Sequence, residues 1–250
     1  MNTRSYAIGD IHGHPEKLRM AHDLIAADRE RTGDDDAPVI HLGDLTDRGP
    51  GSRAVIDMLI EGRQAGQPWI VLLGNHDRLF RKFLEDPDWQ DPGLRPDLDW
   101  LDPRLGGDTT LQSYGVAPVK GRDPYEVHRE AVAKVPAAHR DFLAALPLYH
   151  ARGEALFVHA GIRPGVPLAE QTEDDLVWIR KGWLEDARDH GPLVVHGHTA
   201  LERPRHFGNR VDLDGGAAYG RPLAAAVIEG REIWLLTPDG RVPLRPEPEA

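Results

Sequence analysis

The 250-residue sequence contains no cysteine, which excludes both disulfide bonds and metal sites built from thiolates. Any metal ion must therefore be held by histidine, carboxylate, amide or backbone groups. Thirteen histidines supply imidazole ligands for such a site.

Long apolar runs are also missing from the sequence. No stretch could span a bilayer, and the first residues, Met1 to Arg4, lead into the chain without the apolar core of a signal peptide. We therefore expect a soluble, cytoplasmic protein with no membrane partner.

Positive charge is scarce, with 30 Lys and Arg against 41 Asp and Glu and a formal net charge of −11. This balance argues against nucleic acid as a partner, because extended nucleic-acid binding uses a basic surface to displace counterions. A small phosphorylated ligand remains compatible with the charge, since metal ions and arginines make a locally positive site.

The pattern of apolar residues predicts an α/β fold in one domain, residues 1–242, with a flexible tail at 243–250. Short buried strands are expected at 5–8, 39–42, 70–73, 156–158 and 193–195, and a hairpin at 223–228 and 232–236. Helical periodicity predicts helices at 15–27, 53–65, 125–134 and 139–145.

Residues 86–108 break this pattern, because they are rich in Pro, Asp and Gly with Trp89 and Trp100 interspersed. The segment is too long for a simple connection. We expect a cap or flap insertion near the functional site at about 86–115, and a structureless surface insertion is the alternative.

Polar clusters follow each of the five predicted strands. In order, they are GDIHG at 9–13, GDLTDRG at 43–49, GNHD at 74–77, HAG at 159–161 and HGHT at 196–199. Ligands of open α/β sheets bind where such strand ends converge, so five polar strand ends describe one site. Each motif alone is weakly specific, whereas the ordered set is highly specific.

The residue types in these clusters point to transition-metal chemistry. Asp10 and His12, two apart on an extended segment, can point the same way and bind one ion together. A carboxylate mixed with imidazole and amide ligands suits Mn²⁺, Fe or Zn²⁺ better than Ca²⁺ or Mg²⁺. Two ions about 3.5–4 Å apart would need a shared carboxylate, and Asp44 is the central candidate.

GDIHG, GDLTDRG and GNHD resemble the three signature blocks of the phosphoprotein phosphatase branch of the calcineurin-like metallophosphoesterases. HAG and HGHT match the two later histidine blocks. The resemblance runs from about Ser5 to Gly216, and it is strongest to bacterial protein phosphatases, including LGGDTTLQSYG at 105–115. It implies a sandwich of two mixed β-sheets flanked by helices, with metals at the sheet edges. Asp77 departs from the Glu that is common in the third block of protein phosphatases.

Carried over residue by residue, the resemblance implies a complete set of metal ligands. Asp10 and His12 would bind the first ion, Asp44 would bridge, and Asn75, His159 and His198 would bind the second. His198 is preferred over His196 because the family's ligand precedes the Thr of the Gly-His-Thr block.

The resemblance also implies the remaining catalytic groups. His76 would be the general acid with Asp47 as its orienting partner, and Arg48 would bind the phosphoryl oxygens. A second arginine is expected before the fifth strand, where Arg180 matches best and Arg163 is the alternative.

These roles are chemically consistent. Two divalent ions can convert a bridging water to hydroxide near neutral pH for in-line attack on phosphorus, without a covalent enzyme intermediate. A planar guanidinium suits the equatorial oxygens of the transition state. An imidazole held by a carboxylate is a suitable proton donor to the leaving alkoxide.

We therefore expect a metal-dependent phosphatase, most simply with two Mn²⁺ ions, that acts on phosphoserine and phosphothreonine in proteins, with phosphotyrosine and small phosphoesters left open. The alternative is a diadenosine tetraphosphate hydrolase, which shares the same motifs. Such an enzyme should offer stacking aromatics and several basic residues. The 86–115 segment has only Arg95 and Arg104 as basic residues, which favours a protein or monoester substrate.

Two further classes are less compatible with the sequence. A catalytically silent scaffold that binds a phosphorylated partner would have lost a ligand or the acid, and none is lost here. A structural metal protein would use four closing ligands without an attendant arginine and acid. The sequence carries no indication of oligomeric state.

Overall fold

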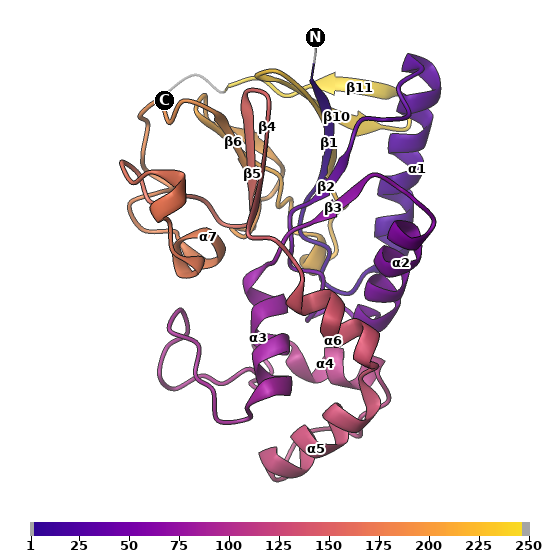
Figure 1. Ribbon diagram of the computed structural model, residues 1–250, viewed down its shortest axis with the longest axis vertical. Coiled ribbons are helices and arrows are strands. Elements are labelled where there is room, and N and C mark those ends of the chain that lie inside the picture. The colour runs from indigo at the N-terminus through magenta and orange to yellow at the C-terminus, as the bar shows by residue number, and fades with distance from the viewer. Residues whose placement is uncertain (1–2, 247–250) are drawn as a thin grey trace.

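The computed structural model describes residues 3–246 (Figure 1). Its strands are β1 (Arg4–Ile8), β2 (Val39–His41), β3 (Trp69–Val71), β4 (Tyr149–Arg152), β5 (Ala155–Val158), β6 (Leu193–His196), β7 (Arg205–His206), β8 (Arg210–Asp212), β9 (Ala225–Glu229), β10 (Glu232–Thr237) and β11 (Gly240–Pro243). Its α-helices are α1 (Pro15–Thr32), α2 (Ser52–Gln64), α3 (Asn75–Glu85), α4 (Gly107–Ser113), α5 (Pro124–Lys134), α6 (Ala137–Ala144) and α7 (Glu173–Trp178), with short 3-10 turns at Leu168–Glu170 and Ala217–Tyr219.

The strands form two mixed sheets, as the sequence predicts. The first has the order β11-β10-β9-β1-β2-β3, in which β1, β2 and β3 are parallel and β9 is antiparallel to β1. The second has the order β4-β5-β6-β8-β7, in which β5, β6 and β8 are parallel. The predicted hairpin is the antiparallel pair of β9 and β10.

The strand sequences are apolar because both faces of each sheet are covered. In β1, Tyr6 and Ile8 face a core shared with the helices, whereas Ala7 faces a second core between the sheets. In β5, Phe157 joins that second core and Leu156 joins a third, against α7. Figure 1 shows α1 and α2 beside β1–β3, and α7 on the opposite side, beside β5 and β6.

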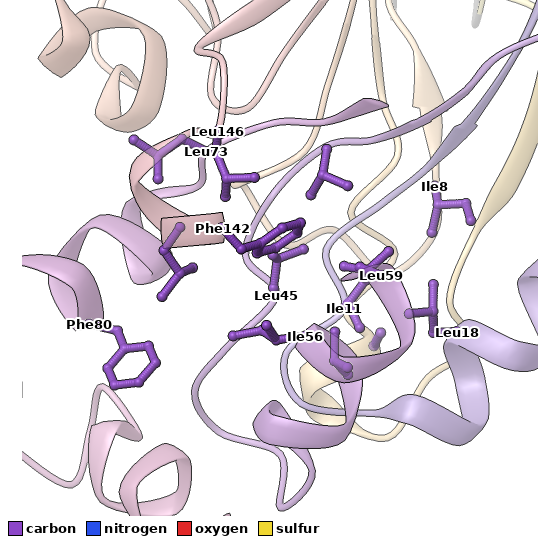
Figure 2. Close-up of a cluster of buried hydrophobic side chains, with 14 of the residues drawn as sticks. Ile8, Ile11, Leu18, Leu45, Ile56, Leu59, Leu73, Phe80, Phe142 and Leu146 are labelled. Atoms are coloured by element: carbon purple, nitrogen blue, oxygen red, sulfur yellow. The ribbon is translucent and has the colours of Figure 1, made fainter. Parts of the chain in front are cut away.

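The helix-side core extends beyond the sheet to the group formed by α3 to α6. Figure 2 shows Ile8 and Leu18 at one end of this cluster and Phe80, Phe142 and Leu146 toward the other. Burial of these side chains is the main favourable contribution to folding in this part of the molecule. It also fixes the position of α3, which carries predicted site residues at its start.

Several elements differ from the predicted ones. Helix α1 continues to Thr32 instead of stopping at 27, and it ends where Gly33 adopts a left-handed conformation with φ of 66°. Helix α3 was not predicted, although its Leu79, Phe80 and Phe83 have helical spacing and are buried. Its first turn consists of polar residues of the GNHD motif, so the apolar helical pattern begins only after that motif.

The insertion segment, defined here as residues 86–106, contains no helix or strand. It leads into α4 and projects beside α3 in Figure 1. The predicted tail at 243–250 begins inside β11, where Pro243 pairs with Trp234. Leu244 then donates its N–H to the carbonyl of Ile233. Residues 247–250 of that predicted tail lie outside the described residues.

No helix within residues 3–246 combines the length and apolarity needed to cross a membrane.

Candidate active site

The polar clusters converge at the carboxyl ends of strands from both sheets. Loops after β1, β2 and β3 of the first sheet carry Asp10, His12 and Asp44 and lead to Asn75 at the start of α3. The ends of β5 and β6 in the second sheet lead directly to His159 and His198. The site therefore lies where two sheets meet, and neither sheet alone supplies it.

Asp44 lies at the centre of two groups of potential metal ligands, one with His12 and His76 and one with His159 and His198. Its Oδ2 is 3.5 Å from His12 Nε2, and its Oδ1 is 3.3 Å from His159 Nε2. A carboxylate with one oxygen toward each group has the geometry expected of a bridging ligand.

Backbone hydrogen bonds orient two of the imidazoles. Nδ1 of His12 lies 2.9 Å from the carbonyl oxygen of Thr46, and Nδ1 of His159 lies 2.8 Å from that of Leu42. A carbonyl only accepts, so in both rings Nδ1 donates and Nε2 presents its lone pair to the site.

Asn75 joins the second group through its side-chain oxygen. Asn75 Oδ1 lies 2.9 Å from His159 Nε2 and 2.8 Å from His198 Nδ1. Nε2 of His198 is buried and has no hydrogen-bond partner among residues 3–246. Three side chains from three different strand ends thus meet at one point.

Asp10 lies beside these groups but outside both of them. Its Oδ2 accepts a hydrogen bond of 2.9 Å from the backbone N–H of His198, while its Oδ1 is buried and has no partner in the described part of the chain. Burial, followed by the charges of Asp214 and Asp44, raises the pKa of Asp10. The expectation that Asp10 and His12 share an extended segment is wrong, because the chain turns at His12, where φ is 46°.

This donor set fits metal cations. A buried carboxylate oxygen and a buried imidazole nitrogen lack partners, and burial lowers the pKa of His12 and His198, which keeps these rings neutral. Burial tends to raise the pKa of Asp44, but its interactions with the surrounding histidines, His159 first, outweigh burial and lower that pKa, which favours the carboxylate form. Histidine and aspartate residues are therefore positioned to bind metal ions.

Two glycines allow the backbone to come this close. A Cβ on Gly74 would collide with the backbone nitrogen and Oδ1 of Asp44, and a Cβ on Gly197 would collide with Oδ1 of Asp10. Any side chain at either position would push the carboxylate away from the site.

Backbone strain is concentrated in the same place. Among the described residues, every non-glycine residue with a positive φ is a predicted site residue, namely His12, Asp44, Asp47, Arg48 and His198. Left-handed backbone costs on the order of 1–2 kcal/mol for such residues, and it persists where function requires it. The strained positions therefore mark the site independently of its motifs.

His76 and Asp47 form a buried pair, with 2.7 Å between Nδ1 and Oδ2. The backbone N–H of His76 also donates to Asp44 Oδ1 over 3.0 Å. Asp47 accepts two further hydrogen bonds, from Trp100 Nε1 at 2.8 Å and from Thr110 Oγ1 at 2.7 Å. The motifs do not identify Trp100 and Thr110 as site residues, although both lie in or next to the predicted insertion.

The two predicted phosphate-binding arginines both point into the site. Arg48 Nη1 lies 2.8 Å from His12 Nε2, and its Nη2 lies 3.2 Å from His76 Nε2. Arg180 lines the same cavity, with Nη2 3.4 Å from the carbonyl oxygen of His198. Arg163, the alternative, lies outside, since its side chain is 59% exposed and bonded to Asp175.

The site opens into a cavity of about 220 Å³. Gly93, Leu94, Arg95 and Leu98 of the insertion segment line it, so this segment forms one wall of the cavity. Trp178 is partly buried and also lines the cavity, where it packs against Gly93 of the insertion segment and makes an edge contact with His198.

Residues 3–221 match the family model described as calcineurin-like phosphoesterase. The chain belongs to this family. Its members are phosphoesterase hydrolases, and the two mixed sheets and the histidine and aspartate cluster described above agree with that assignment.

This calcineurin-like phosphoesterase is similar to the bis(5'-nucleosyl)-tetraphosphatase PrpE [asymmetrical] of Geobacillus thermodenitrificans, with 28% identity over 249 residues and 87% of each chain covered. The protein of the same name from Halalkalibacterium halodurans is 26% identical, over 95% of this chain and 94% of its own. Among solved structures, a cold-active protein-tyrosine phosphatase of a psychrophilic Shewanella species has the same fold, with a TM-score of 0.60, 15% identity, and 97% and 80% of the chains covered.

His196 lies behind the site of this phosphoesterase. Its ring packs 5.5 Å from that of Trp183, and burial lowers its pKa to about 3. It belongs to neither group of potential ligands, whereas His198, two residues later, does.

Proposed function

We propose that this phosphoesterase uses two divalent metal ions, most simply Mn²⁺, to remove phosphate from phosphoserine and phosphothreonine side chains of proteins. The observation that carries the proposal is the charge of the cavity. Arg48 and Arg180 line it, and neither forms an ion pair with a carboxylate among the described residues. Two guanidinium groups and two cations match a single dianionic phosphate group.

The proposed ligands are Asp10 and His12 for one ion, Asn75, His159 and His198 for the other, and Asp44 for both. When bound, such ions activate water and withdraw charge from the phosphate oxygens. The residues of the chain orient the substrate around them: Arg48 and Arg180 hold equatorial phosphoryl oxygens.

His76 would deliver a proton from Nε2 to the leaving oxygen. Asp47 keeps the ring oriented through its bond to Nδ1. Leu94, Leu98 and Trp178 make the cavity wall apolar, which limits access of bulk water to the reacting groups.

A second candidate is asymmetrical hydrolysis of bis(5'-nucleosyl) tetraphosphates, which the names of the curated relatives favour. A tetraphosphate chain carries more negative charge than a monoester and calls for more basic residues. Arg95 is bonded to Asp97 at 2.5 Å and Arg104 to Asp102 at 2.7 Å, so the insertion segment offers little uncompensated positive charge. This pairing is the reason for preferring the monoester.

The discriminating experiment uses protein stripped of metal and then supplied with Mn²⁺. We expect kcat/KM for phosphoserine and phosphothreonine peptides to exceed that for diadenosine tetraphosphate. The reverse order would assign the chain to the second candidate and retain the same metal site. No turnover of either substrate class with any divalent ion would overturn both.

Arginine variants test the phosphate-binding assignment in the same assay. Arg180→Ala should lower kcat/KM about a hundredfold, because a donor to the transition-state charge is lost. Arg163→Ala removes a matched positive charge outside the cavity and should leave turnover unchanged. Equal losses in the two variants would contradict the assignment of Arg180.

A further inference from the structure

The carboxylate of Asp47 is fully buried, and hydrogen bonds from three side chains surround it. Oδ2 is shared by His76 Nδ1 at 2.7 Å and Trp100 Nε1 at 2.8 Å. Oδ1 accepts the hydroxyl of Thr110 at 2.7 Å. The indole and the imidazole therefore bind the same oxygen atom.

Trp100 belongs to the insertion segment, yet its ring is fixed in place. It is 5% exposed and stacks on Phe80 with centroids 5.3 Å apart and an interplanar angle of 25°. Phe83 packs against it at 4.9 Å, and a Cβ on Gly107 would collide with the backbone and ring of Trp100. A ring held on several sides holds its N–H in one direction.

The backbone at Asp47 makes this support necessary. Asp47 and Arg48 have φ values of 70° and 67°, so two consecutive residues adopt a left-handed conformation that neither prefers. A carboxylate on such a turn keeps its direction only if its neighbours fix it. The donors from Trp100 and Thr110 approach from outside the 43–49 motif, across 53 and 63 positions of sequence.

We propose that Trp100 is a positioning residue for proton transfer by His76, acting through the shared oxygen of Asp47. The indole N–H holds Oδ2 where it accepts the Nδ1–H of His76, and this directs His76 Nε2 toward the leaving group. The proposal rests on the proposed function, since it assumes that His76 is the general acid. It gives the insertion segment a role in catalysis besides lining the cavity.

The test varies the leaving group of the substrate. The leaving group of phenyl phosphate is a basic phenolate, which needs a proton. The leaving group of 2,4-dinitrophenyl phosphate is a stable anion, which does not. Trp100→Phe keeps an aromatic ring but removes the donor. We expect kcat for phenyl phosphate to fall about tenfold and kcat for 2,4-dinitrophenyl phosphate to change less than about twofold, with KM unchanged for both.

Trp183→Phe is the matched control, because Trp183 is also buried and its indole Nε1 has no hydrogen-bond partner among the described residues. It should lower turnover of the two substrates equally, if at all. If Trp100→Phe lowered kcat equally for the two substrates, the indole would act only through packing, and the proposal would be overturned. Replacement of Trp100 by benzothienylalanine, in which sulfur takes the place of the N–H, repeats the test with the shape of the ring preserved.

The variant His76→Ala distinguishes a failure of the positioning role from a failure of the proposed function. If His76→Ala lowers kcat much more for phenyl phosphate than for 2,4-dinitrophenyl phosphate, and both Trp100 variants lower it equally, the positioning role alone is wrong. If His76→Ala lowers kcat equally for the two substrates, the assignment of His76 as the general acid is wrong, and the proposed role of Trp100 is wrong as well. Discrimination in the same direction by His76→Ala and both Trp100 variants supports the proposal.

Discussion

Asp77 connects two of the loops that build the site. Its Oδ1 accepts hydrogen bonds from the N–H groups of Leu45 and Thr46 and from the Thr46 hydroxyl, and its Oδ2 accepts the N–H of Gly74. All four groups are donors, so they favour the ionised carboxylate and oppose the burial that raises the pKa of Asp77. The aspartate that departs from the usual Glu of this motif thus anchors the loop that carries Asp44.

Asp77→Asn tests this anchoring without a change in size. The amide presents one donor where the carboxylate presented an acceptor, so at least one buried N–H loses its partner. We expect the free energy of unfolding to fall by about 1–3 kcal/mol and the affinity for Mn²⁺ to fall about tenfold or more. Urea unfolding of the metal-free protein and a metal titration measure the two effects. Unchanged metal affinity would mean that the loop holds its shape without Asp77.

At the scale of elements, a histidine pair joins α1 to the first sheet. His22 of α1 and His41 of β2 face each other through their Nε2 atoms at 2.9 Å, and His22 stacks on Trp69 of β3 with centroids 4.3 Å apart. Burial lowers the pKa of His22 from 6.5 to about 4 and lowers that of His41 as well. At least one of the two rings must be neutral to make this hydrogen bond, because two imidazolium rings would have no acceptor between them.

This pair predicts acid sensitivity. His22 binds a proton near pH 6.5 in the unfolded chain and only near pH 4 in the folded chain, so the free energy of unfolding falls as the pH drops through that window. Unfolding by urea at pH 7.5 and 5.0 should show the loss. In His22→Phe the loss should be smaller, by up to about 1 kcal/mol per pH unit. An equal pH dependence in both proteins would exclude His22 as a contributor.

The sequence predicts those elements that carry a recognisable apolar pattern within their own residues. Continuous apolar runs identify β1, β2, β3, β5 and β6 because both sheet faces are covered. Strand β4, by contrast, is a largely exposed edge strand, and β7 has only two residues, so neither carries an apolar signal. Of the site, the ligand types and their strand ends can be predicted. The supporting bonds of Trp100 and Asp77 cannot, because they depend on tertiary contacts across many positions of sequence.

At the scale of the whole molecule, we propose that residues 1–242 act as one domain because the metal site joins its two sheets. Asp10, His12 and Asp44 follow strands of the first sheet, and His159 and His198 follow strands of the second. Burial first, and then repulsion from neighbouring carboxylates that include Asp44, raises the pKa of Asp10 when no cation is present. A bound cation replaces that repulsion with attraction.

Metal binding should therefore stabilise the whole fold. Mn²⁺ at a hundred times its Kd should add about 2.7 kcal/mol to the free energy of unfolding, which corresponds to a rise in Tm of about 5–10 °C. Calorimetry with increasing Mn²⁺, and again after chelation, measures the shift. His159→Ala should reduce the shift, whereas His150→Ala, on the exposed strand β4, should not. A Tm independent of Mn²⁺ concentration would contradict the proposed linkage.

The order of the strands has a consequence for biosynthesis. β1 lies between β2 and β9, and Asp10 accepts its hydrogen bond from His198, 188 positions later. When the ribosome has synthesised the first three polar clusters, the second sheet, which completes the site, has not yet been synthesised. Because the partner strands emerge last, the nascent chain holds an open edge at β1 until nearly the whole polypeptide has left the exit tunnel. Interrupted translation should therefore release inactive, aggregation-prone fragments, never a shortened enzyme.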